Sequence, residues 1–346
     1  IATSAATIGF GYDANNQVTQ VSSTLKTGLQ ITNKLVKDAD GKLTSIQKAN
    51  GDVTGLTYDA SSRIASITNK NKLGTVQQSF AYVYDLASNI TSITDKYGVK
   101  QYYSYDARNQ LIKENAITYT YDPMGNRKTR VDGFNYSAYT YDTAGDANRL
   151  LSYTDKSGAT SFNYDANGSV TKKTTPAGIT QYFYDSDSYF TKAVLPNGTT
   201  VEYTYDKLAK HRIQRKETSS VGTVSITKFV YDGDRLVAET NTAGNILKSY
   251  TWDENESLIS ITLPISGVLK TFYYLKNAKG DVLGLADEAG NRVVDYTYDA
   301  WGNITRNATI SATVPTNLNA LNPRLYAGYW YDSTLGLYFM KTRMYD

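Results

Sequence analysis

The sequence predicts an all-β protein built as a long ribbon of antiparallel β-hairpins. Three observations support this prediction. A motif consisting of an aromatic residue, any residue, a second aromatic residue and Asp recurs about every twenty residues along the chain. An apolar residue commonly follows the Asp by five positions, and the 346 residues include 31 Tyr but only 9 Phe. The repeat favours one extended array of similar units over two ordinary globular domains.

Each motif is expected to lie at the end of a strand. Aromatic residues two positions apart lie on one face of a strand, and aromatic and β-branched residues favour the pleated backbone. The second aromatic residue and the following Asp are the candidate structural site of each repeat. These residues are Tyr84 and Asp85, Tyr105 and Asp106, Tyr121 and Asp122, Tyr141 and Asp142, Tyr164 and Asp165, Tyr184 and Asp185, Tyr205 and Asp206, Tyr231 and Asp232, Trp252 and Asp253, Tyr298 and Asp299, and Tyr331 and Asp332.

The Asp is expected to begin a tight turn. In the best copies Gly lies three residues after the Asp, as in Asp299 and Gly302. Asp at the first position and Gly at the fourth are typical of a type I turn, in which the carboxylate accepts backbone N–H groups. No helix is required by the pattern.

The apolar residue five positions after the Asp is expected to open the returning strand and to pack between coils. Asp59, for example, is followed by Ile64 and Ile67. The same spacing identifies a degenerate copy at Asp38, followed by Leu43. Alternating stretches after these residues complete each hairpin.

Composition excludes several classes of protein. There is no Cys, which removes disulfides and thiolate metal sites. The net charge of +3 comes from 36 basic and 33 acidic residues and gives no broad basic surface for nucleic acid. No apolar stretch reaches the roughly 20 residues that span a bilayer, and the first residues lack Met and a charged signal region, as expected for a fragment.

The C-terminal part carries a more specific resemblance. The segment 274–282, the segment 298–303, and the later segments 324–332, 334–338 and 343–346 occur in the order typical of an RHS-associated core. With the Tyr-Asp repeats, they make the chain similar to the RHS/YD-repeat family of bacterial Rhs and wall-associated toxins, Tc toxin cocoons and teneurins. We therefore expect repeats over residues 1–270 and the start of the core over residues 271–346.

The resemblance implies a spiral ribbon that forms part of a hollow β-shell enclosing a C-terminal, usually toxic, polypeptide. Each coil is expected to pair with the next, which would cover most of the ribbon's open edges; the remaining edges could pair with other shell segments. The self-cleavage motifs of the family would follow Asp346 and are absent. The chain is thus expected to be a non-enzymatic encapsulation module, secreted or displayed on a bacterial surface, with no catalytic residue, metal or cofactor.

The repeated Asp residues, His211 and the exposed aromatic residues each allow another interpretation. The repeated Asp residues could form catalytic carboxylate pairs or calcium loops, but turn formation explains all copies and the twelfth-position acidic calcium ligand is missing. His211 lies in a basic stretch, expected to be a solvated or cavity-lining strand, without a serine motif. The main alternative function is an extracellular adhesion module that binds a glycan or a cell-surface protein through exposed aromatic residues such as Trp252.

Overall fold

The structure is a computed structural model that describes residues 6–142, 148–206, 208, 210–340 and 343–345, almost all of them in β-strands or tight turns. The first strands are β1 (Ala6–Tyr12), β2 (Val18–Leu25), β3 (Gln30–Lys37), β4 (Leu43–Gln47), β5 (Val53–Tyr58), β6 (Ile64–Lys70), β7 (Val76–Tyr84), β8 (Ile90–Asp95), β9 (Lys100–Tyr105) and β10 (Leu111–Glu114). They are followed by β11 (Ile117–Tyr121), β12 (Arg127–Asp132), β13 (Asn135–Tyr141), β14 (Leu150–Asp155), β15 (Gly158–Tyr164), β16 (Val170–Thr175), β17 (Gly178–Tyr184), β18 (Phe190–Val194), β19 (Thr200–Asp206), β20 (His211–Thr218) and β21 (Val224–Asp232). The last part contains β22 (Arg235–Thr240), β23 (Ile246–Trp252), β24 (Leu258–Ile265), β25 (Val268–Lys276), β26 (Val282–Ala286), β27 (Arg292–Tyr298), β28 (Ile304–Thr309), α1 (Leu318–Leu321), the 3-10 helix η1 (Tyr326–Gly328), β29 (Trp330–Asp332), β30 (Leu337–Met340) and β31 (Arg343–Tyr345).

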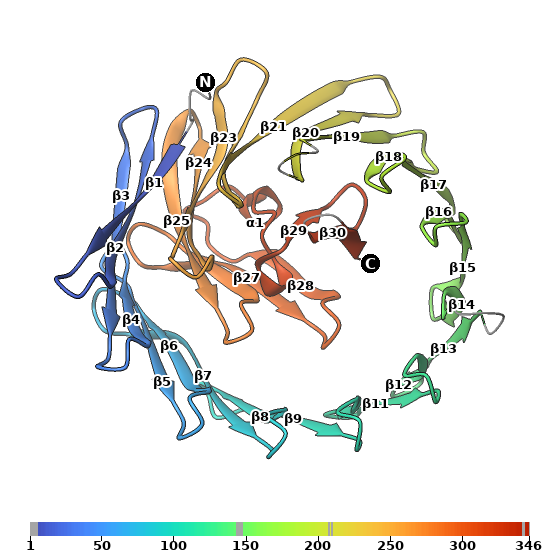
Figure 1. Cartoon of the computed structure of the whole chain (residues 1–346), viewed down its shortest axis with the longest axis horizontal. Helices are drawn as coiled ribbons and strands as arrows, with labels where there is room; N and C mark the ends of the chain where they lie inside the picture. The colour runs from blue at the N-terminus through green and yellow to red at the C-terminus, as the bar shows by residue number, and fades with distance from the viewer. Residues whose placement is uncertain (1–5, 143–147, 207, 209, 341–342, 346) are drawn as a thin grey trace.

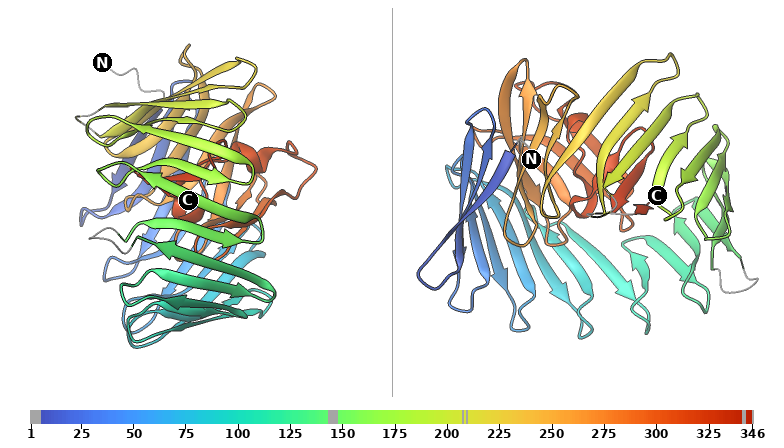
Figure 2. Two further views of the ribbon diagram at one scale, coloured as in Figure 1. Left: turned by 90° about the vertical axis from the view of Figure 1, so that its right-hand side faces the viewer. Right: turned by 45° about the horizontal axis from the view of Figure 1, so that its top comes forward.

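Strands β1–β28 form one antiparallel meander of 28 strands, in which each strand pairs with the next one along the chain. The strands stand side by side in a band, with hairpin turns along both rims (Figure 2). A small separate sheet contains β29–β31. The prediction of an all-β ribbon of antiparallel hairpins is confirmed.

The turn after each motif has a recurring geometry, shown by Asp85. Its N–H donates to the Asn89 carbonyl oxygen at 3.0 Å, and the N–H of Ser88 donates to the Asp85 carbonyl oxygen at 3.1 Å. Ser88 has a φ of 68°, and the strand register shifts beside Tyr84. This is a type I turn closed by a residue with positive φ. Gly, Asn or Ser occupies this fourth position in most copies, whereas Glu256 occupies it after Asp253. The degenerate copy at Asp38 forms the same turn, between β3 and β4.

The band curves through more than one full circle, so that its C-terminal part lies inside its beginning (Figure 1). We call β1–β21 the outer coil and β22–β28 the inner coil. The coils meet face to face through apolar side chains: Ala6 and Leu25 with Val237 and Ala238. The expectation that one coil pairs with the next through strand edges is therefore wrong, because the meander already pairs both sides of every strand between β2 and β27.

Burial is uneven along the band. The largest apolar cluster includes Tyr250, Ile261, Tyr274, Leu285 and Tyr296, all in the inner coil. In contrast, strands β12–β16 make extensive contacts only with the strands that precede and follow them in the sequence. This part of the outer coil is a wall one strand layer thick.

The C-terminal residues depart from the repeat. The repeat pattern requires no helix, and the short helices α1 and η1 both lie after the meander, outside the repeats. The 28-strand sheet crosses position 270 within β25 and continues to Thr309. A domain boundary at residue 270 stays a prediction.

Candidate functional site

The second aromatic residue of the motif links neighbouring hairpins. The Tyr84 hydroxyl donates to the Ile64 carbonyl oxygen at 2.8 Å, and Ile64 is the apolar residue that opens the preceding returning strand. Equivalent bonds of 2.6–3.1 Å are made by Tyr105 to Ile90, Tyr121 to Leu111, Tyr164 to Leu150, Tyr205 to Phe190, Tyr231 to Arg212, Tyr298 to Val282 and, through its indole N–H, Trp252 to Leu236. The side chain at the end of one strand thus holds the start of the strand that precedes it. Tyr141 and Tyr184 occupy the corresponding positions at the ends of β13 and β17.

The Asp of the motif acts within its own turn. Asp299 Oδ1 accepts the N–H groups of Trp301 at 2.9 Å and Asn303 at 3.0 Å. The same pair of acceptor contacts occurs at Asp59, Asp106, Asp122, Asp165, Asp185 and Asp253, and Asp85 Oδ1 accepts the N–H four residues on. Asp206 Oδ1 accepts the N–H of Leu208, Asp142 forms an ion pair with Arg149, and Asp232 ends β21 opposite Arg235. Hydrogen bonds to the charged form, led by the Asn126 amide, lower the pKa of Asp122.

Gly302 has a second role beyond its turn. Its φ is 89°, and a Cβ at this position would lie 2.6 Å from the Tyr326 ring. The Tyr326 hydroxyl donates to the Ala300 carbonyl oxygen at 3.0 Å, and the Tyr338 hydroxyl donates to the Gly302 carbonyl oxygen at 3.0 Å. The turn at Gly302 is therefore where the inner coil holds the segment that follows it.

We call the described residues of 318–345, which contain α1, η1 and β29–β31, the C-terminal module. The module lies within the circle of the wall (Figure 1). On the far side from Gly302 it reaches the outer coil, where Leu335, Leu337 and Met344 pack against an apolar cluster that includes Phe190 and Val201. The module thus connects the inner coil to the opposite stretch of wall.

The first polar anchor of the module is Asp332, the last Asp of the repeat pattern. It is 1% exposed, and its carboxylate receives Arg215 Nε at 2.7 Å, Arg215 Nη2 at 3.0 Å and the Tyr203 hydroxyl. Burial acts to raise the pKa of Asp332, but the bonds from Arg215 outweigh it and hold the pKa below its ordinary value. Unlike the other copies, Asp332 therefore forms an ion pair between the module and the outer coil in addition to stabilising its own turn.

The second polar anchor is Glu239 on β22, which is 1% exposed. Its carboxylate accepts the indole N–H of Trp330 at 2.8 Å, the Tyr250 hydroxyl at 2.6 Å and Lys248 Nζ at 2.8 Å. Burial opposes the charge, yet Lys248 and these donors lower the pKa of Glu239. A fully bonded carboxylate thus fixes the first strand of the module.

Arg212 lies between the wall and the module. Its guanidinium carbon is 4.0–4.9 Å from the ring centres of Phe339 and Trp330 in the module and of Phe229 and Tyr203 in the wall. The side chain is 1% exposed. The basic stretch is thus not solvated at Arg212, because four aromatic faces cover it.

His211, the single histidine of the chain, directly precedes Arg212. Its ring stacks on Tyr231 with centres 4.2 Å apart, and Nε2 lies 3.0 Å from Asp234 Oδ1. A search of the described residues finds no group of three or more His, Asp or Glu side chains that could hold a metal ion. These surroundings contain no nucleophile hydrogen-bonded to His211 among the described residues.

The inner face of the single-layer wall carries aromatic side chains. Tyr153 lies 5.7 Å from Tyr139 and 6.2 Å from Phe162, measured between ring centres. Arg127 lies over both Tyr139 and Trp301, at 4.4 Å and 4.3 Å. This stretch therefore presents rings and a few cations to the interior.

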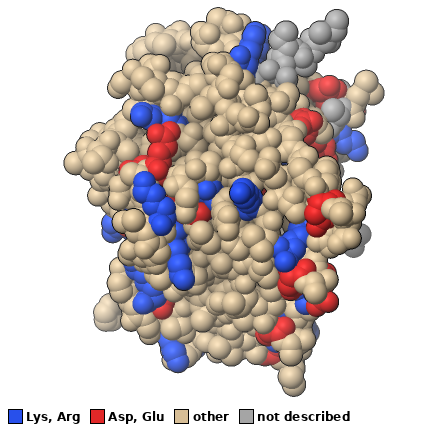
Figure 3. All heavy atoms as spheres, turned by 90° about the vertical axis from the view of Figure 1, so that its left-hand side faces the viewer, with Lys and Arg blue, Asp and Glu red and all other residues tan. Residues whose placement is uncertain are grey.

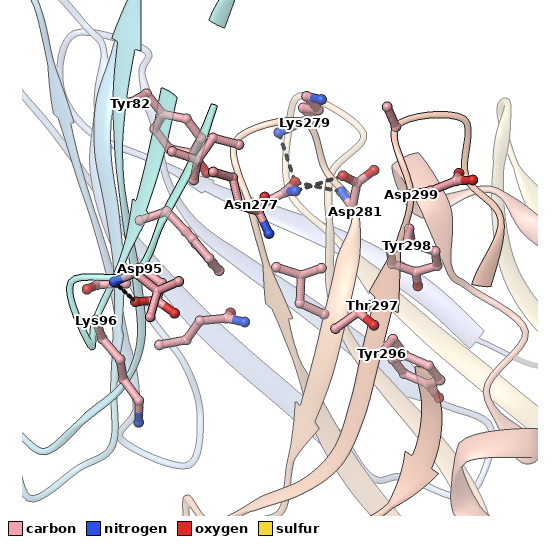
Figure 4. Close-up of a pocket in the computed structure, with 18 of the residues that line it drawn as sticks. Tyr82, Asp95, Lys96, Asn277, Lys279, Asp281, Tyr296, Thr297, Tyr298 and Asp299 are labelled. Atoms are coloured by element: carbon pink, nitrogen blue, oxygen red, sulfur yellow. Dashed lines mark hydrogen bonds between the residues drawn. The ribbon is translucent and has the colours of Figure 1, made fainter. Parts of the chain in front are cut away.

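A hollow of about 270 Å³ lies between the two coils near β7–β9 (Figure 4). Tyr82 from the outer coil and Asn277, Lys279 and Asp281 from a turn of the inner coil face it. The Tyr82 hydroxyl accepts the N–H of Ala278 at 2.9 Å, which joins the coils at one edge of the hollow.

Three structural findings bear on the other candidate partners, a glycan, nucleic acid and a membrane. Trp252 is 9% exposed and Trp330 is 7% exposed, with both indole N–H groups bonded internally. Trp252 is therefore not available to stack on a glycan. On the face of β1–β9 shown in Figure 3, basic and acidic side chains are interspersed, without a continuous basic patch for nucleic acid. No helix in the described chain combines the length and apolarity needed to cross a bilayer.

Sequence reasoning missed Arg212, Arg215 and Glu239. The motif marks residues that repeat, and these three occur once each. A weak signal was present for Glu239, a charged residue that directly follows the apolar residues Leu236, Val237 and Ala238. The partners of Arg212, Arg215 and Glu239 lie about 90–130 residues away in the module.

Comparisons with known proteins agree with this architecture. A family model described as teneurin YD-shell matches residues 55–145 and, in a second match, residues 76–346. The tRNA3(Ser)-specific nuclease WapA of Bacillus spizizenii is 32% identical over 319 residues, which cover 89% of this chain and 13% of that protein. The tRNA nuclease WapA of Bacillus subtilis is 33% identical with the same coverage. The chain thus spans about an eighth of the length of these relatives.

Two solved structures share the fold. The Photorhabdus luminescens Tc holotoxin pore matches with a TM-score of 0.68 and 17% identity, over 99% of this chain and 18% of that one. The TcdB2-TccC3-Cdc42 crystal structure matches with a TM-score of 0.52 and 15% identity, over 99% of this chain and 22% of that one. The curved, open meander is therefore that of a β-shell.

Proposed function

The chain belongs to the teneurin YD-shell family of RHS/YD-repeat proteins, and from this premise we propose that it is part of a shell wall that encloses a passenger polypeptide. The passenger would follow the module in the chain and would be protected until delivery. The wall would act by keeping other macromolecules away from the passenger, and it would catalyse no reaction itself.

The observation that carries this proposal is the position of the module. Two buried carboxylates, Asp332 and Glu239, hold it against the inside of the wall. A polypeptide that continues after Tyr345 would therefore begin on the inner side of the band. The aromatic inner face near Tyr153 would offer apolar contacts to such a passenger.

The relatives support a toxic passenger and an extracellular route. Both WapA proteins are named as tRNA nucleases, and this chain corresponds to 13% of each. We propose that the nuclease-like or other toxic activity of the parent protein lies outside the 346 residues. Secretion or display on a bacterial surface would bring such a protein to its target.

A protection assay tests the proposal. A flexible polypeptide with several protease sites is appended after Asp346, and the same polypeptide is appended before Ile1 in a matched fusion. We expect the C-terminal copy to be cleaved several-fold more slowly, because the wall hinders a protease that reaches the interior. Equal cleavage rates in the two fusions would refute enclosure.

A further inference from the structure

Three arginines surround a hollow of about 350 Å³ between the wall and the module. Arg212 and Arg235 come from β20 and β22, and Arg324 comes from the module just before η1. Lys210 also lines the hollow, whereas its acidic side chains are Asp234 and Glu256. Basic groups therefore outnumber acidic ones around this space.

The arginines keep unused hydrogen-bond donors although they are buried. Arg212 is 1% exposed and Arg324 is 9% exposed. Nε and Nη1 of Arg212, Nε of Arg324 and Nε of Arg235 have no hydrogen-bond partner among the described residues. Buried polar groups are normally bonded, and unpaired buried charge is costly.

Aromatic contacts do not replace these bonds. The rings around Arg212 cover the face of its guanidinium, and Arg324 lies 5.1 Å from the ring centres of Tyr250 and Trp252. A cation–π contact satisfies the charge from above the plane, but the N–H groups point outward within the plane. Arg235 Nη2 donates to the Glu254 carbonyl oxygen at 3.2 Å and Arg324 Nη1 to the Gly328 carbonyl oxygen at 3.4 Å, but the Nε groups of all three arginines lack an acceptor among the described residues.

The nearby carboxylates are already engaged. Asp332 acts on Arg212 through its charge but gives its oxygens to Arg215 and Tyr203. Asp234 contacts His211, and Glu256 is exposed at a turn. The described residues show no ion pair for Arg212, Arg235 or Arg324.

We propose that this hollow is a binding site for a small oxyanion, of the carboxylate or phosphate class. Arginine binds such groups with its planar donors, and the hollow is larger than one water requires. Since Arg212 belongs to the outer coil, Arg235 to the inner coil and Arg324 to the module, one anion would join all three. The anion would thereby strengthen the docking of the module.

Thermal unfolding and calorimetry of the whole chain test this proposal. The probes are inorganic phosphate, a free anion, and N-acetylglutamate, which mimics the acidic side chain of a polypeptide, each compared with chloride at equal ionic strength. We expect at least one probe to raise the melting temperature by about 2 °C or more and to bind with measurable heat. The more effective probe identifies the source of the oxyanion.

Arg212→Met and Arg235→Met should weaken binding by about tenfold or more, because each removes charged donors. Arg63→Met is the matched control, since Arg63 also lies over a tyrosine, Tyr84, but does not line the hollow. If Arg212→Met fails to fold, the half-buried Arg235 still decides the matter. No stabilisation beyond chloride, or equal binding by all variants, would overturn the proposal.

Discussion

Most of the Tyr-Asp pairs contact two hairpins at once. The Asp closes the turn that follows it, whereas the Tyr reaches back to the hairpin before it, as Tyr105 does to Ile90. Repeating this pair at every second strand makes each unit dependent on its neighbour. The array is therefore stabilised by nearest-neighbour links, as in other repeat proteins.

Substitution of Asp299 by Ala tests the turn role. The change removes the acceptor for the N–H groups of Trp301 and Asn303 and for the Asn303 side-chain amide. We expect a loss of about 1 kcal/mol in the free energy of unfolding, measured with urea. An unchanged midpoint of urea unfolding would show that water replaces the carboxylate without loss of stability.

Substitution of Tyr105 by Phe tests the backward link. It removes the 3.0 Å bond from the hydroxyl to the Ile90 carbonyl oxygen but keeps the ring. We expect a loss of about 1 kcal/mol in the free energy of unfolding. Tyr102→Phe on the same strand is the control, because Tyr102 is 57% exposed and should tolerate the change. Equal effects of the two changes would assign the loss to something other than this bond.

The sequence predicted the turns well but not the tyrosine bonds. A turn depends on residues that are close in the chain, so Asp38 was found even without its aromatic partner. The Tyr105 bond depends on how two hairpins lie side by side. Spacing alone does not reveal that geometry.

Among the elements, the C-terminal module shows how the repeat is adapted for another use. β29 still carries Tyr331 and Asp332, but it belongs to a three-stranded sheet inside the band. Asp332 keeps turn contacts, accepting the N–H of Thr334 at 3.0 Å, while Arg215 from the wall binds its oxygens. The pattern correctly placed a turn here, but the ion pair links residues 117 apart in sequence and no local rule predicts it.

Asp332→Asn should undock the module. The substitution keeps the shape but leaves the Arg215 guanidinium with a single carboxylate partner, Glu217. We expect a loss of about 3 kcal/mol in the free energy of unfolding and faster proteolysis after β28. Asp132→Asn is the control, since the Arg130–Asp132 pair at 3.0 Å is partly exposed and should contribute less than about 1 kcal/mol. A similar small effect at both sites would mean that the module does not depend on this anchor.

On the scale of the whole molecule, contact between the coils buries Lys48, and Lys276 lies half-buried nearby. Lys48 of the outer coil donates to the Tyr274 carbonyl oxygen of the inner coil at 3.0 Å, and Lys276 donates to the Ser257 hydroxyl. Burial lowers the pKa of each lysine to about 8, against the opposing charges of Asp52 and Asp253 respectively. The sequence could not predict this meeting, because the curvature of the band, summed over some twenty strands, decides which residues face each other.

These lysines should make stability rise with pH. Between about 8, their folded pKa, and the ordinary value of 10.5, the unfolded chain binds more protons than the folded chain. The free energy of unfolding should therefore increase between pH 8 and 9.5, by about 1–2 kcal/mol per lysine. Above pH 10 the trend should reverse, because burial raises the pKa of Tyr274 and the unfolded chain loses that proton first. Lys48→Met should flatten the rise measured by urea unfolding, whereas Lys100→Met, at an exposed site, should not. An equal slope in both variants would show that burial at the contact between the coils does not lower the pKa of Lys48.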